Sequence, residues 1–308
     1  MKQFTLWAVF FAMAGLSFGQ ATTPRQPVID IHLHSESLGN LKSFGPNPVT
    51  GSKAPASVEE HVRQTLLMMS RYNIVLGVAS GDLDTVEQLR KAAPERIWAG
   101  PSEGIPGLDI ESLRSRYEAG KLRIMGEVLA QYYGLSPSDL VLDPYFALAE
   151  SLSVPACIHM GMSFPGITES EPKFRLSLGN PLMLEELLNR HSKMRVWIAH
   201  MGFPYLEETI GILNVYPRVH VDTGAIDWIE PGFSSYLQQL IRYGFEKRIM
   251  FGSDQMTWLD AIGRAVEAIE KADFLSADQK RDILYSNAAR FLRLTSEQIA
   301  RHHGNSTK

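Results

Sequence analysis

Short apolar stretches alternate with amphipathic stretches eight times along the chain. The apolar stretches are rich in β-branched residues and lie at 28–34, 73–79, 96–101, 122–128, 155–160, 195–200, 218–223 and 248–253. Between them, apolar residues recur three and four positions apart, as at Val58, Val62 and Leu66. That spacing is typical of one buried face of an α-helix. The pattern therefore predicts eight strands that alternate with helices.

Strands that alternate with helices run parallel and are joined by crossovers, which is the α/β class. Eight repeats close into a (β/α)₈ TIM barrel, and we expect a single domain over residues 21–294. An open doubly wound sheet is the alternative, and it would place a ligand at one crevice. An extra C-terminal helix, about Ala277 to Leu294, is expected to pack across the barrel. Residues 295–308 are expected to form a disordered tail.

Side chains that bind metal ions stand at the carboxyl ends of five of these stretches. They are His32, His34, Glu127, His159, His200 and Asp254. Burying an unpaired polar group costs a few kcal/mol, so their repetition at one end predicts a convergent polar site. In a barrel this end carries the active site, and it is shaped by loops. The long connections 35–56, 130–142 and 161–180 leave the strands at this end.

The most specific motif is His32-Leu33-His34. Side chains alternate across a strand, so both imidazoles should point into the barrel while Ile31 and Leu33 face the helices. Two inward histidines can share one metal ion. Asp30 lies on the same face and is expected to orient one of them.

The remaining candidates have structural alternatives. His159 and His200 each begin a His-Met-Gly turn, and a buried histidine can instead be satisfied by a backbone carbonyl. Asp254 can act as ligand and proton acceptor, or it can cap a helix that begins near Thr257. Glu127 follows Gly126 and can bridge two ions or pair with a loop arginine. The single cysteine, Cys157, is expected to be a small buried filler rather than a ligand.

Histidines away from the strand ends are expected to be structural. They are His61, His191, His220, His302 and His303. The net charge of −4, without a block of Lys or Arg, gives no indication of nucleic-acid binding. We expect a small-molecule substrate, and an assembly of identical subunits stays open.

The first residues have the pattern of a secretory signal peptide, assigned to residues 1–20. Lys2 precedes an apolar run from Phe4 to Phe18, and cleavage is expected after Gly19 or Ala21. The alternative is a membrane anchor, but the run is short and lacks a stop-transfer flank. The sequence therefore predicts export to the periplasm or medium, with no membrane association after cleavage.

Several segments together resemble the amidohydrolase superfamily, in its amidohydrolase-related (amidohydrolase 2) branch. They are Ile29–His34, Gly126–Glu127, Ile158–His159, Ala199–Gly202, Phe251–Asp254 and Ile283–Arg290. The resemblance implies a distorted barrel with a divalent metal, often zinc, held by the first-strand histidines, His159 and Asp254. It also implies that His200 handles protons or polarises the substrate. Glu127 stands where many relatives have a carboxylated lysine, so that two-metal centre is not expected.

The resemblance and the site residues together predict a metal-dependent hydrolase that cleaves a C–N or C–O bond of an amide, lactone or cyclic ester. We expect one zinc ion, with a second ion at Glu127 left open. The alternatives are a non-oxidative decarboxylase of an aromatic or unsaturated carboxylic acid and a non-catalytic metal-binding barrel. Lys173, Arg175, Trp228 and Tyr133 are candidates to contact the substrate from loops at the mouth.

Overall fold

The computed structural model describes residues 25–102 and 104–304, so the proposed signal peptide lies outside the described residues. It contains a strand at each of the eight predicted places. They are β1 (Val28–Ser35), β2 (Ile74–Gly81), β3 (Ile97–Pro101), β4 (Met125–Val128), β5 (Ala156–Ile158), β6 (Val196–Ile198), β7 (Val219–Asp222) and β8 (Ile249–Met250).

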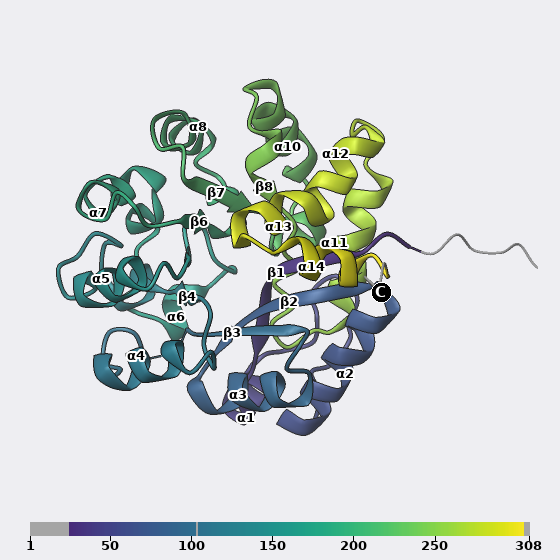
Figure 1. The fold of residues 1–308 in the computed structure, drawn as a ribbon, viewed down its shortest axis with the longest axis horizontal. Coiled ribbons are helices and arrows are strands. Elements are labelled where there is room, and N and C mark those ends of the chain that lie inside the picture. Colours follow the sequence, from purple (N-terminus) through teal and green to yellow (C-terminus); the bar gives the residue numbers. More distant parts are fainter. Residues whose placement is uncertain (1–24, 103, 305–308) are drawn as a thin grey trace, which may run out of the picture.

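The described helices lie around the strands or, in the case of the last two, across one end of the barrel (Figure 1). They are α1 (Leu38–Ser43), α2 (Val58–Arg71), α3 (Leu83–Ala92), α4 (Ile110–Glu118), α5 (Asp143–Ser151), α6 (Ile167–Ser170), α7 (Glu185–Arg190), α8 (Leu206–Val215), α9 (Ile226–Ile229), α10 (Phe233–Arg242), α11 (Asp260–Lys271), α12 (Ala277–Arg281), α13 (Asn287–Leu292) and α14 (Ser296–His302). Ser57 and Asp109 cap α2 and α4 through their side-chain oxygens. Among the described helices, none has the length and apolarity to cross a membrane.

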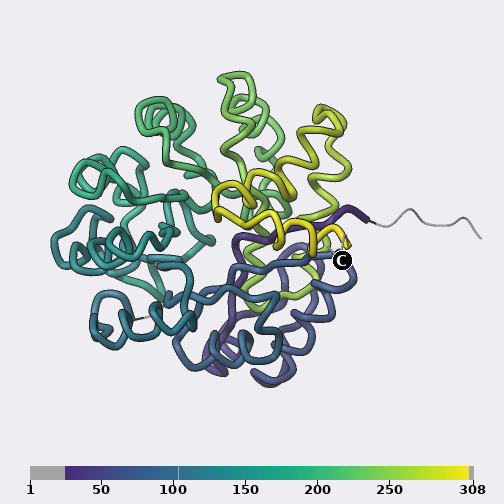
Figure 2. Tube along the Cα trace, viewed as in Figure 1, coloured from purple at the N-terminus to yellow at the C-terminus, as the bar shows by residue number. Residues whose placement is uncertain are grey.

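Hydrogen bonds between neighbouring strands close the barrel. Parallel pairing joins β1 to β2 and β2 to β3, and it joins β4 through β8 in sequence order. The amide of Ile31 donates to the carbonyl of Phe251 at 3.0 Å, and Arg123 donates to Ala99 at 2.8 Å. The first bond links β1 to the residue that follows β8. The second bond links β3 to the segment that precedes β4. The chain thus passes once around a closed ring, as the trace in Figure 2 shows, and the predicted (β/α)₈ fold is confirmed.

Two apolar clusters hold the barrel together. The larger one lies between the strands and the outer helices. The smaller one joins inward residues of the strands, such as Val78 and Trp197, to Ala288 and Phe291 of α13. This second cluster fills one end of the barrel. The polar strand ends are at the other.

The predicted inward and outward faces of β1 are wrong at one position. Leu33 faces the outer cluster as expected, but Ile31 packs in the inner cluster. The cause is a break in the pairing register between Asp30 and Leu33, where β1 pairs with β2. An irregularity of this kind interrupts strict alternation, so neighbouring side chains can share a face.

The extra C-terminal helix is present, but it is interrupted. Helix α12, a π-helical turn at Asp282–Ser286 and α13 follow one another. The buried amide of Asn287 donates to the carbonyls of Ile249, at 2.5 Å, and Glu246, at 2.8 Å, and so fixes this segment to β8. In Figure 1, α13 and α14 cross one end of the barrel.

The prediction that residues 295–308 are disordered is wrong for residues 295–304, which the structure describes. Residues 296–302 form α14, and Thr295 and Gln298 make a capping box at its start. His302 lies 3.0 Å from the hydroxyl of Tyr285 through its Nδ1. A capped turn with a tertiary contact is enough to order a terminal segment that has little apolar periodicity. The last four residues lie outside the described chain.

Candidate active site

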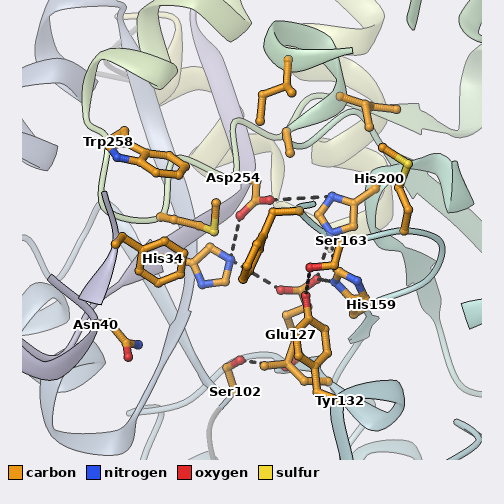
Figure 3. Close-up of a pocket in the computed structure, with 18 of the residues that line it drawn as sticks. His34, Asn40, Ser102, Glu127, Tyr132, His159, Ser163, His200, Asp254 and Trp258 are labelled. Atoms are coloured by element: carbon orange, nitrogen blue, oxygen red, sulfur yellow. Dashed lines mark hydrogen bonds and ion pairs between the residues drawn. The ribbon is translucent and has the colours of Figure 1, made fainter. Parts of the chain in front are cut away.

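The carboxyl ends of β1 and β4 and the segment after β8 bring four ligand atoms together (Figure 3). The Nε2 atoms of His32 and His34 are 3.2 Å apart. Glu127 Oε2 lies 3.4 Å from the first and 3.5 Å from the second. Asp254 Oδ1 lies 3.0 Å from His34 Nε2. Ligands at about 2.1 Å from a tetrahedral zinc ion would be about 3.4 Å apart, so this spacing fits one ion.

The proton positions also fit a cation. His32 Nδ1 lies 3.0 Å from a carboxylate oxygen of Asp222, which can only accept, so Nδ1 carries the proton. Asp222, Glu127 and Asp254 outweigh burial and raise the pKa of His32 well above its ordinary value. A metal ion would take the place of the second proton, on Nε2, which faces Glu127 and Asp254. Lone pairs and carboxylates that face one another repel unless a proton or a metal ion lies between them. The donor set of His32, His34, Glu127 and Asp254 therefore suits a divalent metal ion.

Asp222 is a site residue that the sequence analysis missed. Its buried carboxylate accepts hydrogen bonds from Trp197 Nε1, at 3.0 Å, and from the amides of His200 and Gly224, at 3.1 and 2.9 Å, besides its contact with His32. It stands at the end of β7, so the rule applied to the other strands would have found it. Asp30, which we expected to orient a histidine ring, instead accepts from the backbone amides of His32 and Ser253.

The second oxygen of Glu127 faces the other two histidines. His159 Nδ1 lies 2.8 Å from Glu127 Oε1, and His200 Nε2 lies 3.2 Å from the same atom. The other ring nitrogen of His200 donates to the carbonyl of Gly224 at 2.9 Å. His159 Nε2 is buried and has no hydrogen-bond partner within the described chain. All six predicted residues thus meet at one place, with Glu127 between the two groups, and no arginine of the described chain is bonded to Glu127.

The side chains of the site lie on or beside tight turns of the backbone. Gly126 has a φ of +104°, and a Cβ there would lie 2.3 Å from the carbonyl oxygen of Cys157. In the His-Met-Gly turn after β5, Gly161 has a φ of +91° and lies against the backbone of Phe203. His200 and Asp254 themselves have positive φ, at 57° and 45°. Non-glycine residues in this region cost energy, and they cluster at functional sites. Asp254 does not cap a helix, because α11 begins at Asp260 with Leu259 at its N-cap.

Charges inside the cluster decide its protonation. Burial raises the pKa of the Glu127 and Asp254 carboxyls, but the neighbouring His32 outweighs it, and both pKa values lie below the usual range. Burial disfavours the charged form of His200, yet the hydrogen bond to Glu127 and the charge of Asp254 raise its pKa to about 9. Burial keeps the pKa of His159 below its ordinary value, which favours a neutral ring.

The cluster forms the floor of a cavity of about 480 Å³. The three long loops contribute walls, with Phe44 from residues 35–56, Tyr132 from 130–142 and Phe164 from 161–180. The predicted substrate contacts are not in these walls. Arg175 bonds backbone carbonyls of its own loop, and Trp228 is buried, with its indole donating to Ser253. Tyr132 lines the cavity in place of Tyr133.

The other histidines and the cysteine lie outside this floor. His61 Nε2 contacts the carbonyl oxygen of Met256 at 2.9 Å, His191 contacts Asp143 at 3.0 Å, and His220 packs on Phe291. Cys157 lies in the inner apolar cluster, although its sulfur is within 4.8 Å of ligand atoms of His32 and Asp222. Burial raises the pKa of this thiol well above its ordinary value, so it stays protonated and is a poor ligand.

Comparison with known proteins assigns the family. Residues 29–294 match the family model described as amidohydrolase, which covers most of the chain, so the protein belongs to the amidohydrolase 2 family. It is an enzyme of the metal-dependent, hydrolase-related class, and its family and ligand cluster support binding of a divalent metal ion. No curated protein matches the chain.

Several solved structures share the fold. A 2,6-dihydroxybenzoate decarboxylase from Rhizobium has 14% identity and a TM-score of 0.62, with 87% of this chain and 99% of that chain covered. A probable 2-pyrone-4,6-dicarboxylic acid hydrolase from Acinetobacter baumannii, with citric acid bound, has 17% identity and a TM-score of 0.62 over 87% and 100%. A dihydroxybenzoic acid decarboxylase from Polaromonas sp. JS666, with manganese and the inhibitor 2-nitroresorcinol, has 13% identity and a TM-score of 0.64 over 89% and 99%.

Proposed function

We propose that this enzyme hydrolyses a C–N or C–O bond of an amide, lactone or cyclic ester, with one zinc ion held by His32, His34, Glu127 and Asp254. In this proposal His159, also predicted as a ligand, contacts Glu127 instead of the ion. The observation that carries the proposal is the convergence of two ring nitrogens and two carboxylates at the floor of a cavity. When bound there, such an ion supplies Lewis-acid chemistry, since it lowers the pKa of a water molecule and polarises a carbonyl oxygen.

The residues of the floor divide the proton transfers. Asp254 stays deprotonated, lines the cavity and accepts the proton of the attacking water, which it later passes to the leaving group. His200 is held in orientation by the carbonyl of Gly224 and donates through Nε2 to the oxygen on which negative charge develops. Glu127 keeps His159 in place through its second oxygen, and it shares the Nε2–H of His200 with the substrate oxygen.

Decarboxylation of a carboxylic acid is the second candidate, because decarboxylases share this fold. The walls of the cavity favour hydrolysis. Of the described residues that line it above the floor, none is a lysine or an arginine, whereas Glu230 adds a carboxylate. A substrate with a free carboxylate would meet a like charge on these walls.

Metal analysis and a substrate panel test the proposal. Purified protein should carry close to one zinc ion per chain and should hydrolyse members of an ester, lactone and amide panel. His32→Ala should remove both the ion and the activity, and the matched change His303→Ala, in an exposed residue beyond α14, should remove neither. Release of CO₂ from aromatic acids without hydrolysis would overturn the reaction. Protein that neither retains metal nor regains activity with added metals would overturn the site.

A further inference from the structure

Three hydrogen bonds tie the segment after β8 to the carboxyl end of β1. The backbone amide of Asp254 donates to the carbonyl of His32 at 2.8 Å. The side-chain amide of the next residue, Gln255, makes two bonds to the backbone of His34. Its Oε1 accepts from the N–H of His34 at 3.1 Å, and its Nε2 donates to the carbonyl of His34 at 2.7 Å. We call these two bonds the Gln255 clamp.

The side chain of Gln255 takes the place of a strand backbone. Before it, the chain after β8 bonds directly to β1, as in the bond from Ile31 to Phe251. Asp254 and Met256, on either side of Gln255, both have a φ of +45°, which lies outside the extended region. The backbone there cannot continue a parallel ladder. A primary amide carries a donor and an acceptor on one planar group, as a peptide unit does, so Gln255 supplies the next two bonds to β1.

Burial makes this clamp costly to lose. Gln255 is 0% exposed, and both polar ends of its side chain are used in the clamp. An apolar side chain in its place would leave the N–H and the carbonyl of His34 without these two partners. A buried donor or acceptor that loses its partner is not compensated by water, so the backbone at His34 would have to shift.

The two histidine ligands of β1 are held in different ways. His32 is held through its ring, because its Nδ1 lies 3.0 Å from a carboxylate oxygen of Asp222. The Nδ1 of His34 lies 3.9 Å from Glu36 Oε1, which is longer than a hydrogen bond. The position of the His34 ring therefore depends more on its backbone, and the clamp holds that backbone.

The clamp also joins His34 to a second ligand. His34 Nε2 lies 3.0 Å from Asp254 Oδ1, and Figure 3 shows the two groups facing each other. Because Gln255 follows Asp254 directly, one peptide unit and one side chain connect the two ligands. We propose that Gln255 is a positioning residue, whose amide holds the backbone of His34 at the distance from Asp254 that a single metal ion requires. The inference rests on the ligand set of the proposed function and not on its reaction.

Zinc affinity tests the inference without any turnover. Gln255→Met keeps a long, unbranched side chain but removes both bonds. Gln255→Asn keeps a buried amide, but it is one methylene shorter and cannot make both bonds. Chelator competition on the folded proteins should show that the zinc dissociation constant rises about ten- to a hundredfold in each variant.

The absorption spectrum of the cobalt-loaded enzyme provides a readout that a merely structural residue would not change. Zinc has a filled d shell, whereas cobalt has visible bands that depend on the geometry of its ligands. At saturating cobalt, both Gln255 variants should show bands that differ in position or intensity from those of the parent.

The matched control is the same substitution at another buried glutamine. Gln131 is 1% exposed, and its Nε2 donates to the carbonyl of Gly161 at 2.9 Å, away from the proposed ligands. Gln131→Met should lower the free energy of unfolding of the zinc-free protein, but it should leave zinc affinity and the cobalt spectrum unchanged. If the Gln255 variants likewise lose only stability, the positioning role is overturned.

The outcomes separate this inference from the proposed reaction. Parent enzyme that binds neither zinc nor cobalt would overturn the ligand set and the clamp together. Zinc binding by the parent, with unchanged affinity and spectrum in both Gln255 variants, would overturn the clamp alone. Absence of hydrolysis, together with the expected loss of zinc affinity, would contradict the reaction and support the clamp.

Discussion

Asp254 and His200 carry the proton transfers of the proposed reaction. Asp254 is also a proposed metal ligand, so its substitution is tested with saturating zinc, whereas substitution of His200 separates chemistry from metal binding. Asp254→Asn should lower kcat by about 10² to 10⁴ with a smaller change in KM, because the amide fills the space but accepts no proton. His200→Asn should lower kcat while its zinc content stays near that of the parent. Steady-state kinetics with saturating zinc and elemental analysis measure both effects. Full activity with unchanged metal in both variants would show that this floor is not the active site.

Asp222 acts through His32 rather than on the substrate. Asp222→Asn keeps the shape of the side chain but removes the charge that holds the proton on His32 Nδ1. Zinc affinity should fall about ten- to a hundredfold, and excess zinc should restore most of the activity. Chelator competition measures the affinity.

The control for Asp222 is another buried carboxylate of the same neighbourhood. Asp30 contacts backbone amides and not a ring nitrogen, so Asp30→Asn should cost stability with a smaller change in zinc affinity. Loss of zinc affinity to the same extent in both variants would indicate a general structural role for Asp222.

At the scale of elements, the end of β4 depends on a residue without a Cβ. Gly126→Ala would place a methyl group 2.3 Å from the carbonyl of Cys157 at a φ of +104°, so the strand end that carries Glu127 must shift. We expect a loss of about 1–3 kcal/mol in unfolding free energy and weaker zinc binding. At Gly211 in α8, an added Cβ would meet no atom within 4 Å beyond the backbone of its own helix, so Gly211→Ala should instead gain up to about 1 kcal/mol. Urea unfolding with zinc present compares them, and equal effects would contradict the steric argument.

The contact of β7 with α13 makes stability depend on pH. Burial lowers the pKa of His220 from its ordinary value of 6.5 to about 4. The centroid of its ring lies 4.7 Å from that of the Phe291 ring. The unfolded chain therefore binds a proton before the folded chain does. Stability from this group is present above pH 6.5 and is lost as the pH falls toward 4, by up to about 3 kcal/mol. His220→Gln should flatten the pH dependence of the unfolding free energy in this window, whereas His303→Gln should not. If His220→Gln leaves the slope of unfolding free energy against pH unchanged, other titratable groups dominate that pH dependence.

At the scale of the whole molecule, the leader and the barrel are separate predictions. We expect the protein to be exported, with a mature chain that begins at Gln20 or Thr22, because the apolar run from Phe4 to Phe18 has the length of a signal peptide. N-terminal sequencing of protein from the periplasm or medium measures the start. An intact Met1 in the membrane fraction would contradict the prediction.

The sequence by itself determined the class of fold and the position of the site. Apolar periodicity locates elements because burial of one face is a local property, and all eight strands lie where it placed them. The family follows from motifs at the strand ends, from His32-Leu33-His34 to Asp254. Parallel strands in a closed barrel bring these ends together without any knowledge of side-chain packing.

Only the tertiary structure decided which atoms meet. The register break in β1, the contact of His32 with Asp222 of β7, and the placement of Glu127 between two pairs of histidines depend on strands distant in sequence. The order of residues 296–302 likewise depends on a short helix, capped by Thr295, that contacts Tyr285. The bonds from Gln255 to the backbone of His34 have the same origin, because the sequence shows only a polar residue beside Asp254. Periodicity reports which face is buried, whereas electrostatics and hydrogen bonding depend on distances that only the folded chain fixes.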